Sequence, residues 1–306
     1  MELANLKQAG FNTTALGVLR GVATYYGLPV SDAFLFGASG HAFLINIHEV
    51  LCPSGPYCWN REPFERLAGN LGIEVIDHGF FGARNGPVPR GEIEAILMAE
   101  LRQGVPCSLL NMENQLITGF DDTGLLTAQP WAPHVDFPPK HLTFDTWTEL
   151  DEGIHLNFYS LRRGQPIAPQ QAAAAGLEYA VDLHRHPEHH SGSPYGAGPR
   201  AYQIWIDAVR AGHGNSHGNW WNGTVWAECR GMASRFLREI AAEHPHVADP
   251  ALELATAFGE IAELVGKASD KALADDAKVA TLESAAAREA ATVPGLEALA
   301  GALRAA

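Results

Sequence analysis

The segment AGFNTTALGVLRGVATYYG, residues 9–27, has the pattern of a loop that turns into a helix at Asn12. Asparagine is among the preferred helix-capping residues, and apolar residues recur after it at helical spacing until Gly27. A nucleophile placed where a loop enters a helix gains from the helix dipole and the unpaired N–H groups, which lower the pKa of a thiol. The stretch therefore predicts a helix N-terminus of the kind that holds an active site, with asparagine where a cysteine enzyme has its nucleophile.

Length and composition predict a globular chain with room for two domains. The 306 residues are 46% hydrophobic and 18% charged, which is typical of a folded protein. A net charge of −14 disfavours nucleic acid and anionic membrane surfaces as partners. The first residues lack a signal-peptide pattern, and no stretch approaches the run of about 18 apolar residues that a membrane span needs. We therefore expect a cytoplasmic protein.

The order of expected elements predicts an α+β first domain. They are helices at 12–27 and 30–38, a strand at 41–50, a helix and a strand within 60–81, a helix within 90–106, three short strands within 107–131, and a last strand within 154–164. Helices followed by mostly antiparallel strands are typical of the α+β class.

The composition changes after residue 164, where Pro, Gln and Ala replace the strand pattern. We therefore expect an α+β domain over 1–165 and a helical domain over 166–306, with its first helix at 170–185. The later segments are rich in alanine and have apolar positions at helical spacing, which predicts an antiparallel helical bundle.

Four segments of the chain resemble a known family. Residues 10–43 (GFNTTALGVLRGVATYYGLPVSDAFLFGASGHAF) and 104–131 (GVPCSLLNMENQLITGFDDTGLLTAQPW) resemble the butirosin biosynthesis protein H N-terminal family. That family looks like a relative of the papain-like cysteine peptidases that trim bacteriocin leaders. Residues 196–209 and 233–241 resemble a helical domain of unknown function that is often fused to it. The resemblance implies a papain-like first domain, a helical second domain, and an ancestral chemistry of acyl transfer or amide cleavage.

The resemblance also identifies the positions of the triad. Papain-like chemistry needs a cysteine at a helix N-terminus, a histidine at the start of a later strand, and an Asp or Asn that orients the histidine. The family pattern puts these positions at Asn12, Glu113 and Gln129. A register shift by one replaces Glu113 with Asn114 and also supplies no histidine. Cysteine acylation therefore cannot run at this place.

Three functions remain open for such a chain. The first is an altered enzyme that transfers or hydrolyses an acyl or amide group on a small metabolite. Glu113 would be its general acid or base, while Asn12, Gln129 and the helix N-terminus polarise a carbonyl. The second is an inactive descendant that binds a small molecule, a peptide or an acyl-carrier protein in the old cleft. The third is a structural accessory protein that forms a homodimer through its helical domain.

Residues around Asn12 are the expected substrate contacts. Gln8, Thr13 and Asn114 are assigned this role because they flank the inherited site. Thr13 and Thr14 carry hydroxyl groups that could act as nucleophiles, but the sequence shows no base beside them. The simple alternative for Asn12 is a helix cap, which contributes about 1 kcal/mol.

A second group of reactive residues lies between His41 and Cys58. Its spacing matches no common zinc pattern, so we expect neither a metal nor a cofactor. Cys52, in a turn near His48, is the candidate for a displaced cysteine nucleophile. The four cysteines are too few for a disulfide scaffold, and we expect free thiols.

Two further features bear on ligands. Trp220 and Trp221 open an expected helix, where they either pack in the core or form a ligand wall between the domains. The histidine-rich segment 183–190 is expected to be a loop with only adventitious metal affinity. The negative net charge favours a cationic substrate such as an amino sugar or a polyamine.

Overall fold

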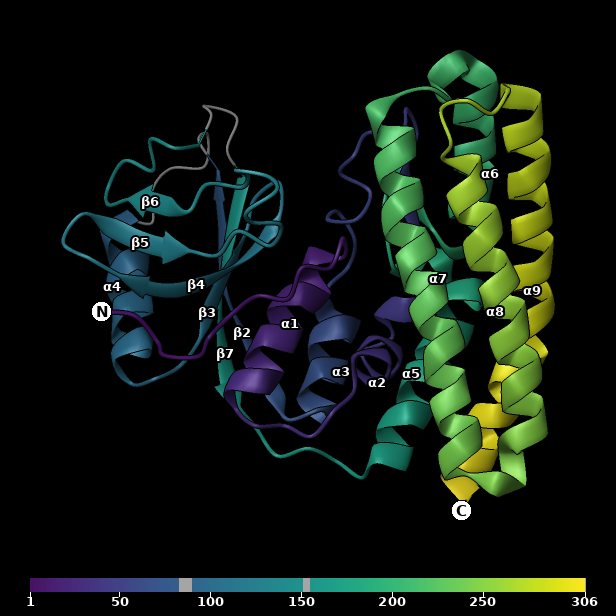
Figure 1. Cartoon of the computed structure of the whole chain (residues 1–306), viewed down its shortest axis with the longest axis horizontal. Helices are drawn as coiled ribbons and strands as arrows, with labels where there is room; N and C mark the ends of the chain where they lie inside the picture. The colour runs from purple at the N-terminus through teal and green to yellow at the C-terminus, as the bar shows by residue number, and fades with distance from the viewer. Residues whose placement is uncertain (83–89, 151–154, 306) are drawn as a thin grey trace. The chain divides into compact units, whose positions relative to one another are not determined.

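The computed structural model describes residues 1–82, 90–150 and 155–305, and it mixes helices with antiparallel sheets (Figure 1). The α+β class and the helical C-terminal region are therefore as the sequence predicts. Within the described residues, no helix combines the length and the apolar character that crossing a membrane requires.

Contacts between Cα atoms divide the chain into two compact units. Unit 1 comprises Met1–Val30 and Ala68–Pro166, and unit 2 comprises Ser31–Leu67 and Ile167–Ala306. The chain passes from unit 1 to unit 2 after Val30, returns to unit 1 after Leu67 and passes to unit 2 again after Pro166. Residues 31–67 therefore belong with the C-terminal helices.

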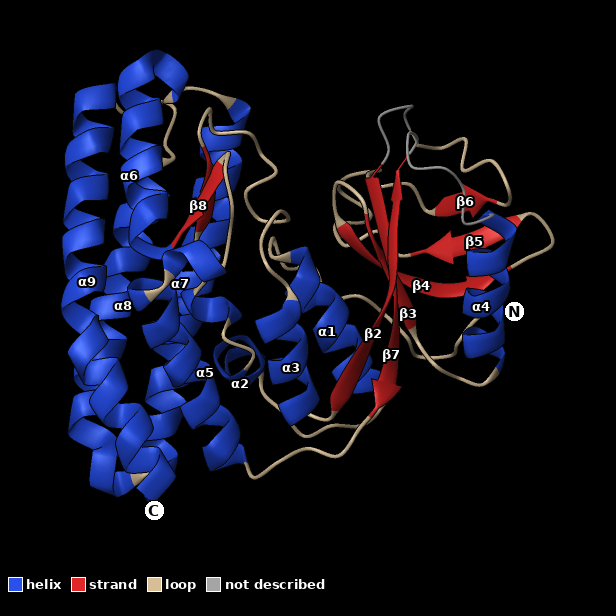
Figure 2. Cartoon of the chain, turned by 180° about the vertical axis from the view of Figure 1, so that it is seen from behind, coloured by secondary structure: helices blue, strands red, loops and turns tan. Residues whose placement is uncertain are grey.

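Unit 1 is built on a six-stranded sheet in which all neighbouring strands are antiparallel. In spatial order the strands are β2 (Ile73–Gly82), β7 (His155–Arg163), β3 (Cys107–Leu110), β4 (Asn114–Phe120), β5 (Gly124–Thr127) and β6 (His141–Thr143). Helix α1 (Thr14–Tyr25) packs on β2 and β4, and α4 (Arg90–Arg102) packs on β3 and β4 (Figure 2). Because β3 and nearly all of β4 are buried, the sheet is covered where α1 begins.

Helix α1 begins two residues later than predicted. Its N-cap is Thr13, whose carbonyl accepts the first helical hydrogen bond from the Gly17 N–H at 3.1 Å. The Thr13 side chain makes no capping bond, and Asn12 lies before the helix. The cap prediction was wrong because three successive residues, Asn12 to Thr14, all have side chains that can cap a helix. The bond between Thr14 and Glu113, which is distant in sequence, determines where the helix begins.

Unit 2 is mainly helical. Its helices are α2 (Asp32–Ala38), α5 (Pro169–Arg185), α6 (Gly198–Ala208), α7 (His217–Glu243), α8 (Ala248–Ala268) and α9 (Asp275–Ala305). The α8 helix packs against both α7 and α9, and the three run side by side in Figure 1. Helix α3 (Glu62–Asn70) spans the crossing after Leu67. The predicted helices at 30–38 and 170–185 are confirmed, and the Ser31 hydroxyl caps α2 by accepting from the Phe34 N–H at 2.9 Å.

The predicted strand over 41–50 is mostly absent. Residues His41–Phe43 form a 3-10 turn, η1, and only β1 (Asn46–His48) is extended, paired with β8 (Tyr195–Ala197). Gly40 precedes the turn with a φ of +76°, a backbone conformation that favours glycine. This turn breaks the alternation on which the strand prediction depended.

A buried ion pair joins four segments of unit 2. The Arg230 guanidinium on α7 donates to Glu289 on α9, with Nη2 and Oε1 2.5 Å apart, and also to the Leu44 carbonyl before β1. The Tyr202 hydroxyl on α6 donates to Glu289 Oε2 at 2.6 Å. Burial alone would raise the pKa of Glu289, but Arg230 and His184 outweigh it and lower the pKa to about 2. Glu289 therefore stays ionised, and the pair fixes how α6, α7 and α9 meet.

His41 is a second buried polar residue of unit 2. Its ring packs against Trp59, Phe64 and Trp226, and no described residue forms a hydrogen bond with its Nδ1 atom. Burial, together with the nearby Arg61 and Arg230, lowers its pKa to about 3. The imidazole is therefore neutral in the folded protein near neutral pH.

His41 should make the protein sensitive to acid. Below the ordinary pKa of about 6.5, His41 takes up a proton in the unfolded chain, whereas in the folded chain it stays neutral until about pH 3. The stability of the fold therefore falls as the pH falls from about 6.5 to about 3. Between pH 7 and pH 5 this costs about 2 kcal/mol. Urea unfolding at both pH values should show a loss smaller by that amount in His41→Phe than in the wild type. The exposed-site variant His246→Ala should behave as the wild type, and equal losses in all three proteins would refute this role of His41.

Candidate functional site

Unit 1 contains a cluster of polar side chains at the start of α1. The Thr14 hydroxyl donates to Glu113 Oε2 at 2.7 Å. The Asn114 backbone N–H donates to Thr14 Oγ1 at 3.1 Å, and the Asn114 side-chain amide reaches the same atom at 3.4 Å. Thr14 is 1% exposed and Glu113 5%. The partner of Glu113 in this cluster is therefore Thr14, two residues after the predicted Asn12.

Gln8 fastens the loop before α1 to the sheet. Its side-chain amide donates to the Asn114 carbonyl at 2.8 Å and accepts from the Leu116 N–H at 2.8 Å. Through these two bonds, the Gln8 side chain pairs with the backbone of β4 as a neighbouring strand would. Gln8 and Asn114, predicted to bind substrate, thus lie together with Glu113, while Thr13 is buried at the helix cap.

Gln129 makes its contacts with its own loop. Its amide donates to Asp136 Oδ1 at 3.0 Å and to the Pro138 carbonyl at 2.9 Å. Gln115 holds the same loop through the carbonyls of Ala128 and Pro139, both at 2.7 Å. These two hydrogen bonds of Gln129 therefore organise the segment after β5.

The bonding of Thr14 decides what the cluster can do. A hydroxyl has one donor hydrogen and two acceptor lone pairs. The hydrogen is given to Glu113, and both lone pairs face donors of Asn114. A nucleophile must offer a lone pair to its substrate, and this oxygen has none to spare. The geometry of the cluster is that of a satisfied buried network, which specifies packing.

Sequence analysis missed the partner of Thr14. It found no base beside the two threonines, whereas the fold supplies the carboxylate of a residue 99 positions away. Three adjacent cap-forming residues gave no local signal to choose between them. Only the contact between α1 and β4 selects Thr14.

The Thr14–Glu113 bond should be measurable by a double-mutant cycle. Thr14→Val leaves a buried carboxylate without its donor and should lower the free energy of unfolding by about 1–3 kcal/mol. Glu113→Gln should show a coupling energy of about 0.5–3 kcal/mol with Thr14→Val, since the two side chains share one bond. Chemical denaturation of the single and double variants gives both values. Thr24→Val, on the exposed side of the same helix, is the matched control, and additive effects would contradict the bond.

Unit 2 contains a cavity of about 360 Å³. It is lined by residues from two segments, the turn after β1 and the chain after α5, namely Cys58, Trp59, Asn60, Glu188, His189, Ser191 and Gly192. Its volume is at the lower end of the range for small-molecule sites. Glu188 is the one acidic residue of this lining, which includes no lysine or arginine.

Backbone contacts hold the two walls of the cavity together. The Asn60 N–H donates to the His190 carbonyl at 2.8 Å, and the Asn60 side-chain amide donates to the His189 carbonyl at 3.0 Å. On the other wall, the buried Asn46 donates to the Cys58 carbonyl at 2.9 Å. The lining is therefore a preformed surface, and sequence analysis missed Asn60 and Glu188 because they are 128 positions apart.

The predicted pairing of Cys52 with His48 receives no support from the contacts. None of the four cysteines forms a disulfide, and the described chain gives no hydrogen bond between the Cys52 thiol and His48. The His48 Nδ1 atom instead accepts from the Val50 N–H at 3.2 Å, and its ring meets Tyr195. Cys58 is the exposed thiol, and it lines the cavity. Burial raises the pKa of Cys107 to about 12, so that thiol is inert.

The two tryptophans at the start of α7 pack within unit 2. The Trp221 indole N–H donates to the Tyr57 hydroxyl at 2.8 Å. Trp220 is 39% exposed, and its ring contacts His217 and Trp221. Neither lines the cavity described above.

Neither a model of a known protein family nor a curated protein matches this chain. The functional interpretation therefore depends on the bonding of Thr14 in unit 1 and on the lining of the cavity in unit 2.

Proposed function

We propose that the chain is a divergent papain-like protein that binds a small, positively charged metabolite and has lost covalent acyl chemistry. The observation that carries this proposal is the saturation of the Thr14 hydroxyl by Glu113 and Asn114. Thr14, Glu113 and Asn114 carry neither a thiol nor an imidazole. The inherited site then serves to stabilise unit 1, and ligand binding belongs to the cavity of unit 2.

The arrangement of α1 and β4 supports the papain-like relationship. In papain-like enzymes the nucleophile at a helix N-terminus meets a base at the start of a later strand. Here Thr14, the first residue of α1, bonds to Glu113, which directly precedes β4. The start of a helix and the residue before a later strand meet here too, although Thr14 lies two residues after the position that the family pattern gives to the nucleophile. This likeness favours descent from such an enzyme with replacement of its triad.

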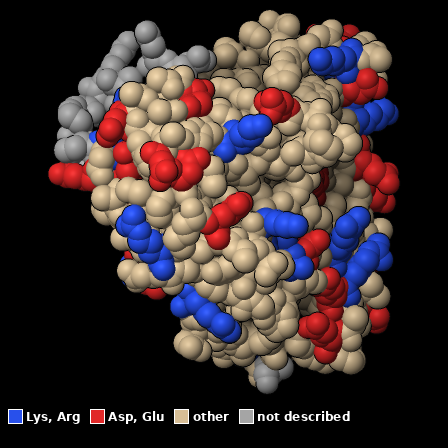
Figure 3. Space-filling model, turned by 60° about the vertical axis from the view of Figure 1, so that its left-hand side comes forward, with Lys and Arg blue, Asp and Glu red and all other residues tan. Residues whose placement is uncertain are grey.

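Charge supports a cationic ligand. The chain carries a net charge of −14, and the carboxylate of Glu188 lines the cavity. On the face drawn in Figure 3, acidic and basic side chains are interspersed, so the net charge is not gathered there into one patch. Local contacts must then select the ligand, and an amine can meet Glu188 together with the polar groups of Asn60 and Ser191.

A second candidate function is an acyl or amide transferase that uses Thr14 as its nucleophile. One observation favours it: the distance of 2.7 Å between Thr14 Oγ1 and Glu113 Oε2 fits a nucleophile and its general base. Such an enzyme must first break the two bonds from Asn114. Burial of both side chains disfavours this route.

Amine binding can be tested with spermidine and glucosamine. We expect either amine to raise the melting temperature of the wild-type protein, because it binds the folded state, and salt should weaken the effect by screening. Glu188→Gln should lose the shift, because it removes the charge of the cavity while keeping its shape. Glu253→Gln, an exposed change on α8, should retain the shift. Equal shifts in all three proteins, or none in the wild type, would refute binding in this cavity.

The two candidate functions differ in covalent chemistry. The protein is incubated with p-nitrophenyl acetate, and intact mass with peptide mapping then locates any acetyl group. The binding proposal expects no acetyl group on Thr14 and the same ester hydrolysis in wild type and Thr14→Ser, since the hydroxyl is saturated. An acetyl group on Thr14 would overturn it in favour of the transferase.

A further inference from the structure

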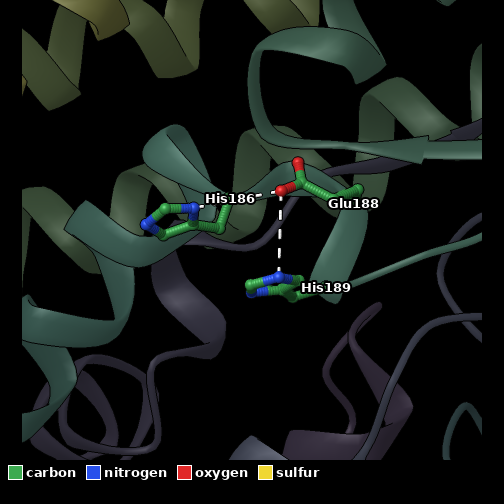
Figure 4. Close-up of side chains that lie close together, drawn as sticks. All are labelled: His186, Glu188 and His189. Carbon is green, nitrogen blue, oxygen red and sulfur yellow. Dashed lines mark ion pairs between the residues drawn. The ribbon is translucent and has the colours of Figure 1, made fainter.

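We propose that His186, Glu188 and His189 form a binding site for a divalent transition metal of the Zn²⁺ type, at the edge of the unit 2 cavity. Nothing in the proposed function requires this site. The three side chains lie together on one turn, with both imidazoles turned toward the Glu188 carboxylate (Figure 4).

The turn that carries them is a 3-10 helix, η2 (Pro187–His189), directly after α5. Such a helix has three residues per turn, so positions i and i+3 lie one above the other. His186 and His189 have this spacing, and their rings stack with centroids 5.2 Å apart and planes 16° apart. The segment was predicted to be a loop and a poor cage for a metal, but its backbone places two imidazoles on one side.

The donor atoms are close to the spacing that a metal requires. Glu188 Oε1 lies 3.9 Å from His186 Nδ1 and 3.8 Å from His189 Nε2, and all three donor atoms lie within 4.8 Å of one another. Ligands on a tetrahedral zinc ion lie roughly 3.4 Å apart when the bonds are about 2.1 Å. Binding requires the three exposed side chains to rotate, and the stacked rings to turn until an in-plane nitrogen lone pair of each points at the ion.

The backbone of the turn is fixed from two sides. His190, the next residue, is 2% exposed, and its Nε2 atom lies 2.8 Å from Asp182 Oδ2 on α5. Its ring also packs edge-on against Tyr179. From the opposite side, Asn60 donates to the carbonyls of His189 and His190. A ligand set on a fixed backbone loses less conformational entropy on binding than one on a free loop.

The set of donors selects the kind of metal. Two imidazoles and one carboxylate suit Zn²⁺ and similar ions, and three protein ligands leave one position open. Glu188 and His189 also line the cavity, so a metal held by them adjoins the space in which a ligand would lie. The open position can then be taken by water or by a donor group of that ligand.

Zinc titration of the untagged protein by calorimetry tests the site. We expect one Zn²⁺ per chain in the wild type, and an affinity lower by about tenfold or more in the double variant His186→Ala/His189→Ala, because two of three ligands are gone. Glu188→Gln should lower the affinity less, since it removes one ligand. The matched control is His244→Ala/His246→Ala, which removes a neighbouring pair of histidines from another 3-10 turn, η4 (Pro245–Val247).

The control should bind Zn²⁺ as the wild type does. Unchanged affinity in His186→Ala/His189→Ala would overturn the site, and so would an equal loss in the control, which indicates diffuse binding to surface histidines. Circular dichroism and melting without metal check that each variant is folded. Because the readout is metal binding, failure of this site and failure of amine binding are distinguishable.

Discussion

The buried ion pair of Arg230 and Glu289 is the interaction on which the architecture of unit 2 depends. Besides joining α7 to α9, it reaches the chain before β1 and the end of α5. Arg230 donates to the Leu44 carbonyl, two residues before β1, and His184 Nε2 lies 3.6 Å from Glu289, just before the η2 turn. Breaking a buried pair by removing one partner costs about 3–5 kcal/mol, so these two segments are held by a strong constraint.

The two units show opposite uses of polar side chains. At the start of α1, Thr14, Glu113 and Asn114 satisfy one another, and such a network fixes packing and leaves little for a substrate. On the η2 turn, His186 and Glu188 are exposed while the backbone beneath them is bonded. Polar groups that remain open on a rigid support can bind, so the best candidate site lies away from the start of α1.

Local patterns predicted the element types well where local forces decide them. The helices predicted at 30–38 and 170–185 depend on neighbours in sequence, and the structure has a helix at both places. The start of α1 depends on Glu113, and the shape of 41–50 depends on the turn at Gly40. At the cavity, Asn60 donates hydrogen bonds to the carbonyls of His189 and His190, in the chain after α5. Such contacts over large sequence separations leave no periodic signal, which is why the residues of the site were the least predictable.

The Glu188 carboxylate links the two proposals for unit 2, because an amine and a metal ion both need it. With the metal absent, the carboxylate gives the cavity negative charge and favours an organic cation. With Zn²⁺ held by this carboxylate and two neutral imidazoles, the same place carries a net positive charge. It then repels amines and attracts a carboxylate or carbonyl oxygen to the open position of the metal. Occupancy by metal would therefore decide the charge class of the metabolite that the cavity accepts.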